Sequence, residues 1–182
     1  MVTLSLCAAP LTGWTADVEF GQIASQTNPV TTSLSKNMTL GIQVYFNKVS
    51  ANGGVLGNKL ILTTLDDGLQ APKMLELTRQ LIDKQSIVGL IGFINSAGLA
   101  EIARQDLPKK NDIALIAPLQ GDKHIVGSTN IFPLRSSYTD EVTFLLKEAK
   151  KWEKDTLAIV NINIAFGPAL AQVANQISGT QG

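Results

Sequence analysis

Apolar positions along this chain follow two spacings that alternate from one end to the other. Short apolar or alternating runs predict strands, whereas apolar residues three or four positions apart predict helices. The predicted strands cover 17–25, 59–65, 87–94, 113–118, 130–135 and 156–162. Helices are predicted to end near 50, to cover 72–84 and 96–107, to begin at 139 and to include 170–177. Such alternation predicts an α/β fold built on a doubly wound parallel sheet.

The same spacing predicts which faces of these elements are buried. The runs 87–94 and 113–118 are apolar almost throughout, so both are predicted to be covered on both faces of the sheet. In the first helix the predicted buried stripe is Met38, Ile42, Tyr45 and Val49. In the helix that begins at 139 it is Val142, Leu145, Leu146 and Ala149.

Charge and composition exclude several classes of partner. Apolar residues make up 45% of the 182 residues and charged residues 16%, so the chain can bury a core. Fifteen basic residues balance fifteen acidic ones, and no block of like charge occurs. A nucleic-acid partner is therefore not expected. No apolar run approaches the roughly 20 residues that cross a bilayer, so membrane insertion is not expected either.

The first sixteen residues differ in character from the rest. They carry no charge before Asp17, and small and apolar residues dominate them. Residues 1–16 are similar to the hydrophobic part of a secretory signal, and Ala16 could precede the cleavage point. A frayed tail or a buried first strand is the alternative. Cys7, which is the one cysteine, lies in this stretch, so no disulfide is expected.

Asp66 and Asp67 are adjacent at the end of a predicted strand. They could bind a metal or share an acid/base role, but a metal site needs further ligands and the chain has a single histidine, His124. Adjacent aspartates after a strand more often bind turn amides or cap a helix. We therefore expect a structural role, no metal site and no enzymatic activity, since a nucleophile–base pair is missing as well.

Asn95 and Ser96 follow a buried strand and open a predicted helix. Backbone amides and the helix dipole then point toward the cleft, where a carboxylate could also accept from the Ser96 hydroxyl. The alternative is that one of these residues is only a helix N-cap. The two interpretations are compatible, and the sequence does not separate them.

Several stretches in this order resemble one family. "GIQVYFNKVSANGGVLGNKLILTTLDDG", "LIDKQSIVGLIGFINSA" and "IALIAPLQG" are similar to type I periplasmic substrate-binding proteins of branched-chain amino acid ABC transporters. "NIFPLRSSYTDEV" and "LAIVNINIAFGPAL" resemble that family's passage into its second lobe. The resemblance implies a periplasmic protein of two α/β lobes that hold an amino acid, an amide or a similar molecule between them. It also implies delivery to a membrane permease, with no cofactor.

The resemblance also implies domain boundaries. Residues 1–16 would be a signal remnant, 17–133 the first lobe, and 134–182 the first hinge crossing with the start of the second lobe. Because the family needs about twice this length, we expect an N-terminal fragment or truncated product that binds ligand weakly or not at all. Its second-lobe part is expected to be loosely held or to pair with another chain. A ligand-sensing domain on the same scaffold, or a non-functional truncated product, is the alternative function.

The ligand-binding residues follow from the resemblance residue by residue. They are Asn95, Ser96, Ala97, Leu119, Gln120, Gly121 and Phe166. Two departures from the family pattern leave the ligand open. Leu34 or Ser33 stands where amino-acid binders often have an aromatic residue, and Leu119 and Gln120 are bulkier than the usual small residues. Amides, urea-like compounds and aromatic acids therefore remain candidates beside leucine-type ligands.

Overall fold

The computed structural model describes residues 17–154, 156, 158–163 and 166–180. The hypothesis of a secretory signal in residues 1–16, with Cys7, lies outside the described residues.

Within this part of the chain, five parallel strands form one sheet in the order β2-β1-β3-β4-β5. The strands are β1 (Val18–Ile23), β2 (Leu60–Leu65), β3 (Ile87–Ile91), β4 (Leu115–Ile116) and β5 (Ile131–Phe132). The chain runs from β1 to one side and then crosses back to β3 on the other side, so the order reverses between β1 and β3. In open parallel sheets, ligands bind beyond the carboxyl ends of strands at such a reversal.

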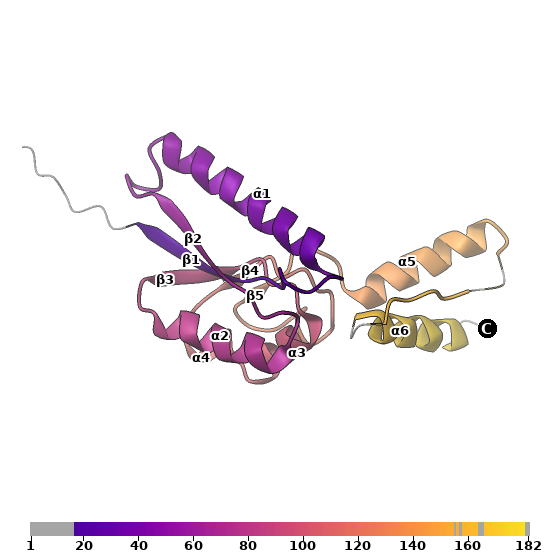
Figure 1. Ribbon diagram of the computed structural model, residues 1–182. Helices are drawn as coiled ribbons and strands as arrows, with labels where there is room; N and C mark the ends of the chain where they lie inside the picture. The colour runs from indigo at the N-terminus through magenta and orange to yellow at the C-terminus, as the bar shows by residue number, and fades with distance from the viewer. Residues whose placement is uncertain (1–16, 155, 157, 164–165, 181–182) are drawn as a thin grey trace, which may run out of the picture.

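Helices cover both faces of the sheet, which confirms the doubly wound α/β prediction. Helix α1 (Thr32–Ala51) lies on one face, and α2 (Ala71–Asp83), α3 (Ser96–Arg104) and α4 (Leu107–Lys110) lie on the other (Figure 1). The main core lies under the second group. Its fully buried members include Ile23, Met74, Leu90, Leu99, Ile102 and Leu115.

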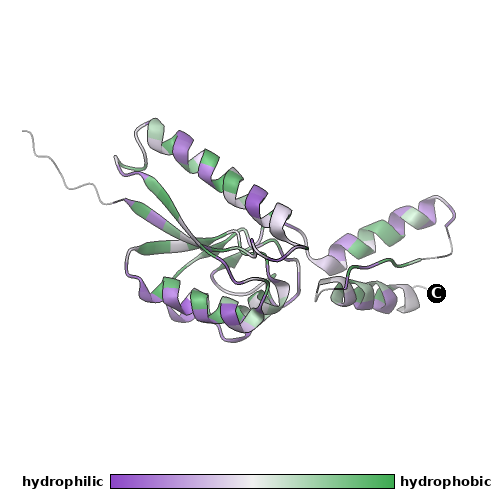
Figure 2. Ribbon diagram, in the orientation of Figure 1, coloured by the Kyte–Doolittle hydropathy of each residue, from purple (hydrophilic) through white to green (hydrophobic). Residues whose placement is uncertain are grey.

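The buried face of α1 differs from the predicted stripe. Tyr45 is 63% exposed, and the adjacent Phe46 is buried instead, with its ring centroid 5.4 Å from that of Phe20 on β1. Met38, Ile42 and Val49 are half-buried. The prediction for Tyr45 was wrong because two aromatic residues are adjacent, and the contact with Phe20 selects Phe46. Figure 2 shows hydrophobic bands along α1 as well as along the strands.

Strands β3 and β4 are shorter than predicted and are not covered on both faces throughout. Glu19 pairs with Ile87 and Phe20 with Gly89, so Val88 is the extra residue of a β-bulge. Val88 is 56% exposed, which contradicts the prediction of a strand covered on both faces. Side chains three positions apart normally lie on opposite faces of a strand, but the extra residue of the bulge allows Ile87 and Leu90 both to join the core. The strand predicted over 113–118 is reduced to Leu115–Ile116.

Beyond the sheet, α5 (Tyr138–Lys151) and α6 (Phe166–Thr180) pack against each other (Figure 1). Both helices were predicted, but Leu145 of the predicted buried stripe is 64% exposed. The strand predicted over 156–162 is wrong for the described residues of that range, which form no strand. A strand needs a hydrogen-bonding neighbour, and these residues have none in the described part of the chain. Val160 is accordingly 97% exposed.

None of the helices in the described ranges combines the length and the apolar character that crossing a bilayer requires.

Candidate ligand-binding site

A cleft of about 180 Å³ lies beyond the carboxyl ends of the strands. Its apolar lining is Leu34, Leu69, Ile94 and Leu119, and its polar lining is Thr31, Ser96, Gln120 and Arg135. Every strand contributes to this lining, because each of the segments that follow β1, β2, β3, β4 and β5 supplies at least one residue. Ser96, Leu119 and Gln120 were predicted as ligand-binding residues, and the structure brings the three together.

The start of helix α3 places hydrogen-bond donors beside this cleft. Asn95 is the N-cap residue, and its side-chain oxygen accepts from the Gly98 amide at 3.1 Å. The cap therefore satisfies the third amide of the helix and leaves the first two. Among the described residues, no acceptor is found for the amides of Ser96 and Ala97 or for the Ser96 hydroxyl. Ser96 itself is half-exposed at the cleft.

Asn95 has a structural role that the sequence left open. The residue is 3% exposed, and its side-chain amide donates to Asp67 Oδ2 at 2.7 Å. With its oxygen on Gly98 as well, both ends of the side chain have protein partners. Ala97 is exposed and does not line the cleft. Of the three predicted residues at this helix start, Ser96 alone presents its side chain to the cleft.

The adjacent aspartates close the turn after β2, as expected. Asp67 is fully buried and accepts from the Ser25 hydroxyl at 2.6 Å and the Leu69 amide at 3.0 Å. Asp66 accepts from the amides of Gln26 and Gly68. Burial raises the pKa of Asp66, but the hydrogen bonds from Gly68, Thr27 and Gln26 outweigh it and lower the pKa below 3.8. The described residues contain no cluster that could hold a metal ion.

Gln120 ties three segments together at the base of the cleft. Its side-chain nitrogen donates to the Ile94 carbonyl at 2.6 Å, and its side-chain oxygen accepts from the Tyr138 hydroxyl. The Tyr138 amide donates to the Gly121 carbonyl at 2.8 Å. Burial raises the pKa of the Tyr138 hydroxyl, which keeps this hydrogen-bond donor protonated at neutral pH. Gln120 therefore lines the cleft with a side chain that is already engaged by the protein.

Gly121 is not among the described residues that line this cleft. Gly121 lines a neighbouring cavity of about 290 Å³, which it shares with Asp122, His124 and residues of α6. Phe166 is the first residue of α6, and its side chain lies outside the described part of the structure.

Arg135 is a cleft residue that the sequence did not single out. Its Nη2 lies 2.5 Å from Glu141 Oε2 and its guanidinium lies 5.2 Å from the Tyr138 ring centroid. The resemblance assigned Arg135 to the hinge crossing only. One signal could have found it: the residue directly follows β5, at the same edge of the sheet as the other loops.

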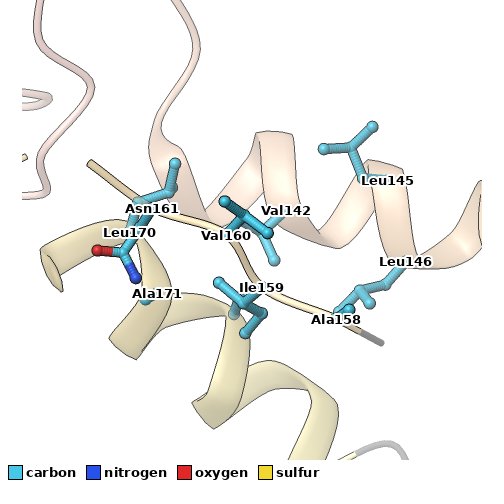
Figure 3. A pocket seen from close by; sticks show the side chains of 10 residues that line it. Val142, Leu145, Leu146, Ala158, Ile159, Val160, Asn161, Leu170 and Ala171 are labelled. Atoms are coloured by element: carbon cyan, nitrogen blue, oxygen red, sulfur yellow. The ribbon is translucent and has the colours of Figure 1, made fainter. Parts of the chain in front are cut away.

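A third cavity, of about 220 Å³, lies between α5, α6 and the segment 158–161 (Figure 3). Nine of its ten lining residues are apolar and the tenth is Asn161. None of the predicted ligand-binding residues whose side chains the structure describes lines it. The cavity therefore offers few groups that could orient a polar ligand.

The sequence model of the periplasmic binding protein family matches residues 17–182. This chain belongs to the periplasmic binding protein family. The resemblance inferred from the sequence is confirmed.

Relatives within the family give the extent of the likeness. The chain is 28% identical over 170 residues to the Leu/Ile/Val-binding protein BraC3 of Rhizobium johnstonii, covering 92% of this chain and 45% of the relative. A substrate-binding periplasmic protein from Ralstonia solanacearum matches with a TM-score of 0.82 at 16% identity, over 91% of this chain and 46% of its own. A fatty acid ABC transporter substrate-binding protein from Thermomonospora curvata matches with a TM-score of 0.77 at 17% identity, over 91% and 42%. The two structures show the fold, and the chain spans less than half the length of each relative.

Proposed function

We propose that this protein is an exported solute-binding protein that captures an amino acid or a related small molecule and delivers it to the permease of an ABC importer. The observation that carries the proposal is the cleft, whose lining comes from the carboxyl ends of all five strands. Membership of the periplasmic binding protein family supports the general role and the periplasmic location. The amino-acid ligand is supported by the likeness to a Leu/Ile/Val-binding protein.

In this proposal, residues 17–133 form one wall of the binding site and residues 134–182 begin the opposite wall. Ser96 and the start of α3 hold the anionic end of the ligand, because a helix N-terminus offers amides and a favourable dipole. Leu34, Leu69, Ile94 and Leu119 contact its apolar part. Ligand contacts made with both walls would favour a closed state, and the permease would recognise that state.

The lining of the cleft supports binding rather than catalysis. Ser96 is a potential nucleophile, but no histidine, aspartate or glutamate is among the described residues that line the cleft with it. Without an adjacent base, a serine hydroxyl is a weak nucleophile. A hydroxyl that donates a hydrogen bond to a bound carboxylate needs no such base.

Replacement of Ser96 by Ala tests this proposal. Binding of L-leucine, L-leucinamide and 4-methylpentanoate would be followed through amide shifts of residues 95–98, since shift titration also detects weak binding. We expect Ser96→Ala to weaken binding of a carboxylate by about 1–3 kcal/mol, the contribution of hydrogen bonds to a charged group. Ser33→Ala is the matched control, because Ser33 is exposed on α1 and does not line the cleft.

Two outcomes would contradict the proposal. One is that no probe shifts these amides, and the other is that Ser96→Ala and Ser33→Ala bind every probe as the unaltered chain does. Delivery to an importer has its own test. A strain that lacks the gene should take up the bound solute more slowly than its parent.

A further inference from the structure

Arg135 brings a positive charge to the wall of the cleft. Among the described residues that line it, Arg135 is the one charged side chain, and no carboxylate accompanies it there. The residue follows β5, whereas Ser96 follows β3, so the two groups approach the same cleft from different strands.

Neighbouring residues fix how the guanidinium is presented. Nε and Nη2 contact the two carboxylate oxygens of Glu141 at 3.1 and 2.5 Å. The Tyr138 ring supports the group from one side, with its centroid 5.2 Å from Cζ. The remaining nitrogen, Nη1, makes only a long contact of 3.5 Å to the Leu119 carbonyl. Arg135 and Leu119 both line the cleft, and Nη1 is the guanidinium nitrogen with spare donor capacity.

The remaining lining groups limit what Nη1 can recognise. Ser96 and Thr31 carry hydroxyls, the side-chain oxygen and nitrogen of Gln120 already have protein partners, and the other four residues are leucine or isoleucine. Such a cleft offers apolar contact and hydrogen-bond donors. Its described lining offers no carboxylate that could pair with a ligand ammonium group.

We infer that Arg135 is a specificity-determining residue, whose Nη1 donates to the carboxylate of a short apolar carboxylic acid bound in this cleft. The inference rests on the proposed function, in which this cleft is the ligand site. Glu141 pairs with two nitrogens of the guanidinium and leaves the third for the ligand, while its negative charge offsets part of the attraction for a carboxylate. Arginine suits this task because its planar group binds two partners at once in fixed directions.

The test compares 4-methylpentanoate with 4-methylpentanamide, which share a carbon skeleton and differ in charge. Arg135→Gln should weaken binding of the carboxylate roughly ten- to hundredfold, the loss expected for a hydrogen bond to a charged group. Binding of the amide should change less than threefold. Glu141→Gln is the matched control, because it breaks the same ion pair but leaves the guanidinium in the cleft. We expect Glu141→Gln to bind the carboxylate as tightly as the unaltered chain or more tightly.

Each outcome separates this inference from the proposed function. If neither probe binds the unaltered chain, the inference fails, and the proposed function fails with it only if L-leucine does not bind either. If a probe binds and Arg135→Gln weakens carboxylate and amide equally, or weakens neither, only the inference is overturned. Equal losses in Arg135→Gln and Glu141→Gln would show that the ion pair matters only for structure. If Arg135→Gln does not fold, Arg135→Lys decides in its place: a threefold or greater loss confined to the carboxylate supports the inference, and a smaller loss or an equal loss for the amide overturns it.

Discussion

The side-chain amide of Asn95 donates a hydrogen bond of 2.7 Å to the buried carboxylate of Asp67, across 28 residues of sequence. This contact joins the segment after β2 to the start of α3, directly below the cleft-lining Ser96. The aspartate thereby fixes the helix start from which the donors of the site extend. Asp67 therefore supports the binding site through the start of α3, although it does not line the cleft.

Replacing Asp67 by Ala should therefore destabilise the protein. The Ser25 hydroxyl, the Leu69 amide and the Asn95 amide would lose their common acceptor. Buried donors without partners are costly, so we expect the free energy of unfolding in urea to fall by about 3 kcal/mol. Asp83→Ala, at the exposed end of α2, should change it by less than about 0.5 kcal/mol. Equal urea midpoints for the two variants would contradict this role of Asp67.

Two glycines should respond to alanine in opposite directions. A Cβ at Gly121 would overlap the Ser136 carbonyl oxygen, whereas a Cβ at Gly41 on α1 would meet no atom within 4 Å. Gly121→Ala should lower the thermal midpoint because the backbone must move to make room. Gly41→Ala should raise the free energy of unfolding by about 0.5–1 kcal/mol, since alanine favours the helix and restricts the unfolded chain. A stabilising Gly121→Ala would show that the loop 119–121 is not held as described.

The stability of the protein should depend on pH through Glu19. Hydrogen bonds from Lys84, Ser86 and Thr63 lower the pKa of Glu19 from 4.5 to about 2. A lowered pKa in the folded state means that the stabilisation is complete above pH 4.5 and is lost as the pH falls toward 2. Urea unfolding at a series of pH values should show this loss, and Glu19→Gln should remove that part of it. The profile of Glu76→Gln, an exposed residue on α2, should follow the unaltered chain.

Two neighbouring hydroxyls on α1 should also behave differently. The buried Ser35 hydroxyl has no hydrogen-bond partner in the described part of the protein. Ser35→Ala should therefore raise the free energy of unfolding by about 1 kcal/mol. One turn later, the Thr39 hydroxyl lies 2.9 Å from Gln22 Oε1 and accepts from Gln26 at 3.2 Å. Thr39→Val keeps the shape but removes these two contacts and a third of 2.9 Å to the Ser35 carbonyl, so it should lower that free energy by a similar amount. Losses in both variants would show that Ser35 has a partner.

The sequence alone determined the class of fold, the structural role of Asp66 and Asp67 and the candidate role of Ser96. These features could be predicted from the sequence because each depends on residues that are close together in the chain. Apolar spacing depends on residues within one turn or one strand, and the aspartates bind amides of their own turn. The resemblance also predicted the family, and the match of the family model over residues 17–182 confirmed that prediction.

Tertiary structure decided which side chain of a local pattern is used. Phe20 on β1 selects Phe46 rather than Tyr45 as the buried residue of α1. The residues described between 156 and 162 are apolar but form no strand, because a strand exists only beside a hydrogen-bonding partner. Both outcomes depend on distant residues that no local pattern specifies.

The same reason explains why Arg135 was recognised only as part of the hinge crossing. Its sequence neighbours do not connect it with Ser96 or Leu119. The strand order β2-β1-β3-β4-β5 brings the carboxyl ends of five separate strands to one edge, where Arg135 also pairs with Glu141. The sequence by itself determined which segments form strands and helices, but the residues that share the cleft were decided by how those strands pair, since that pairing depends on contacts between residues far apart in the chain.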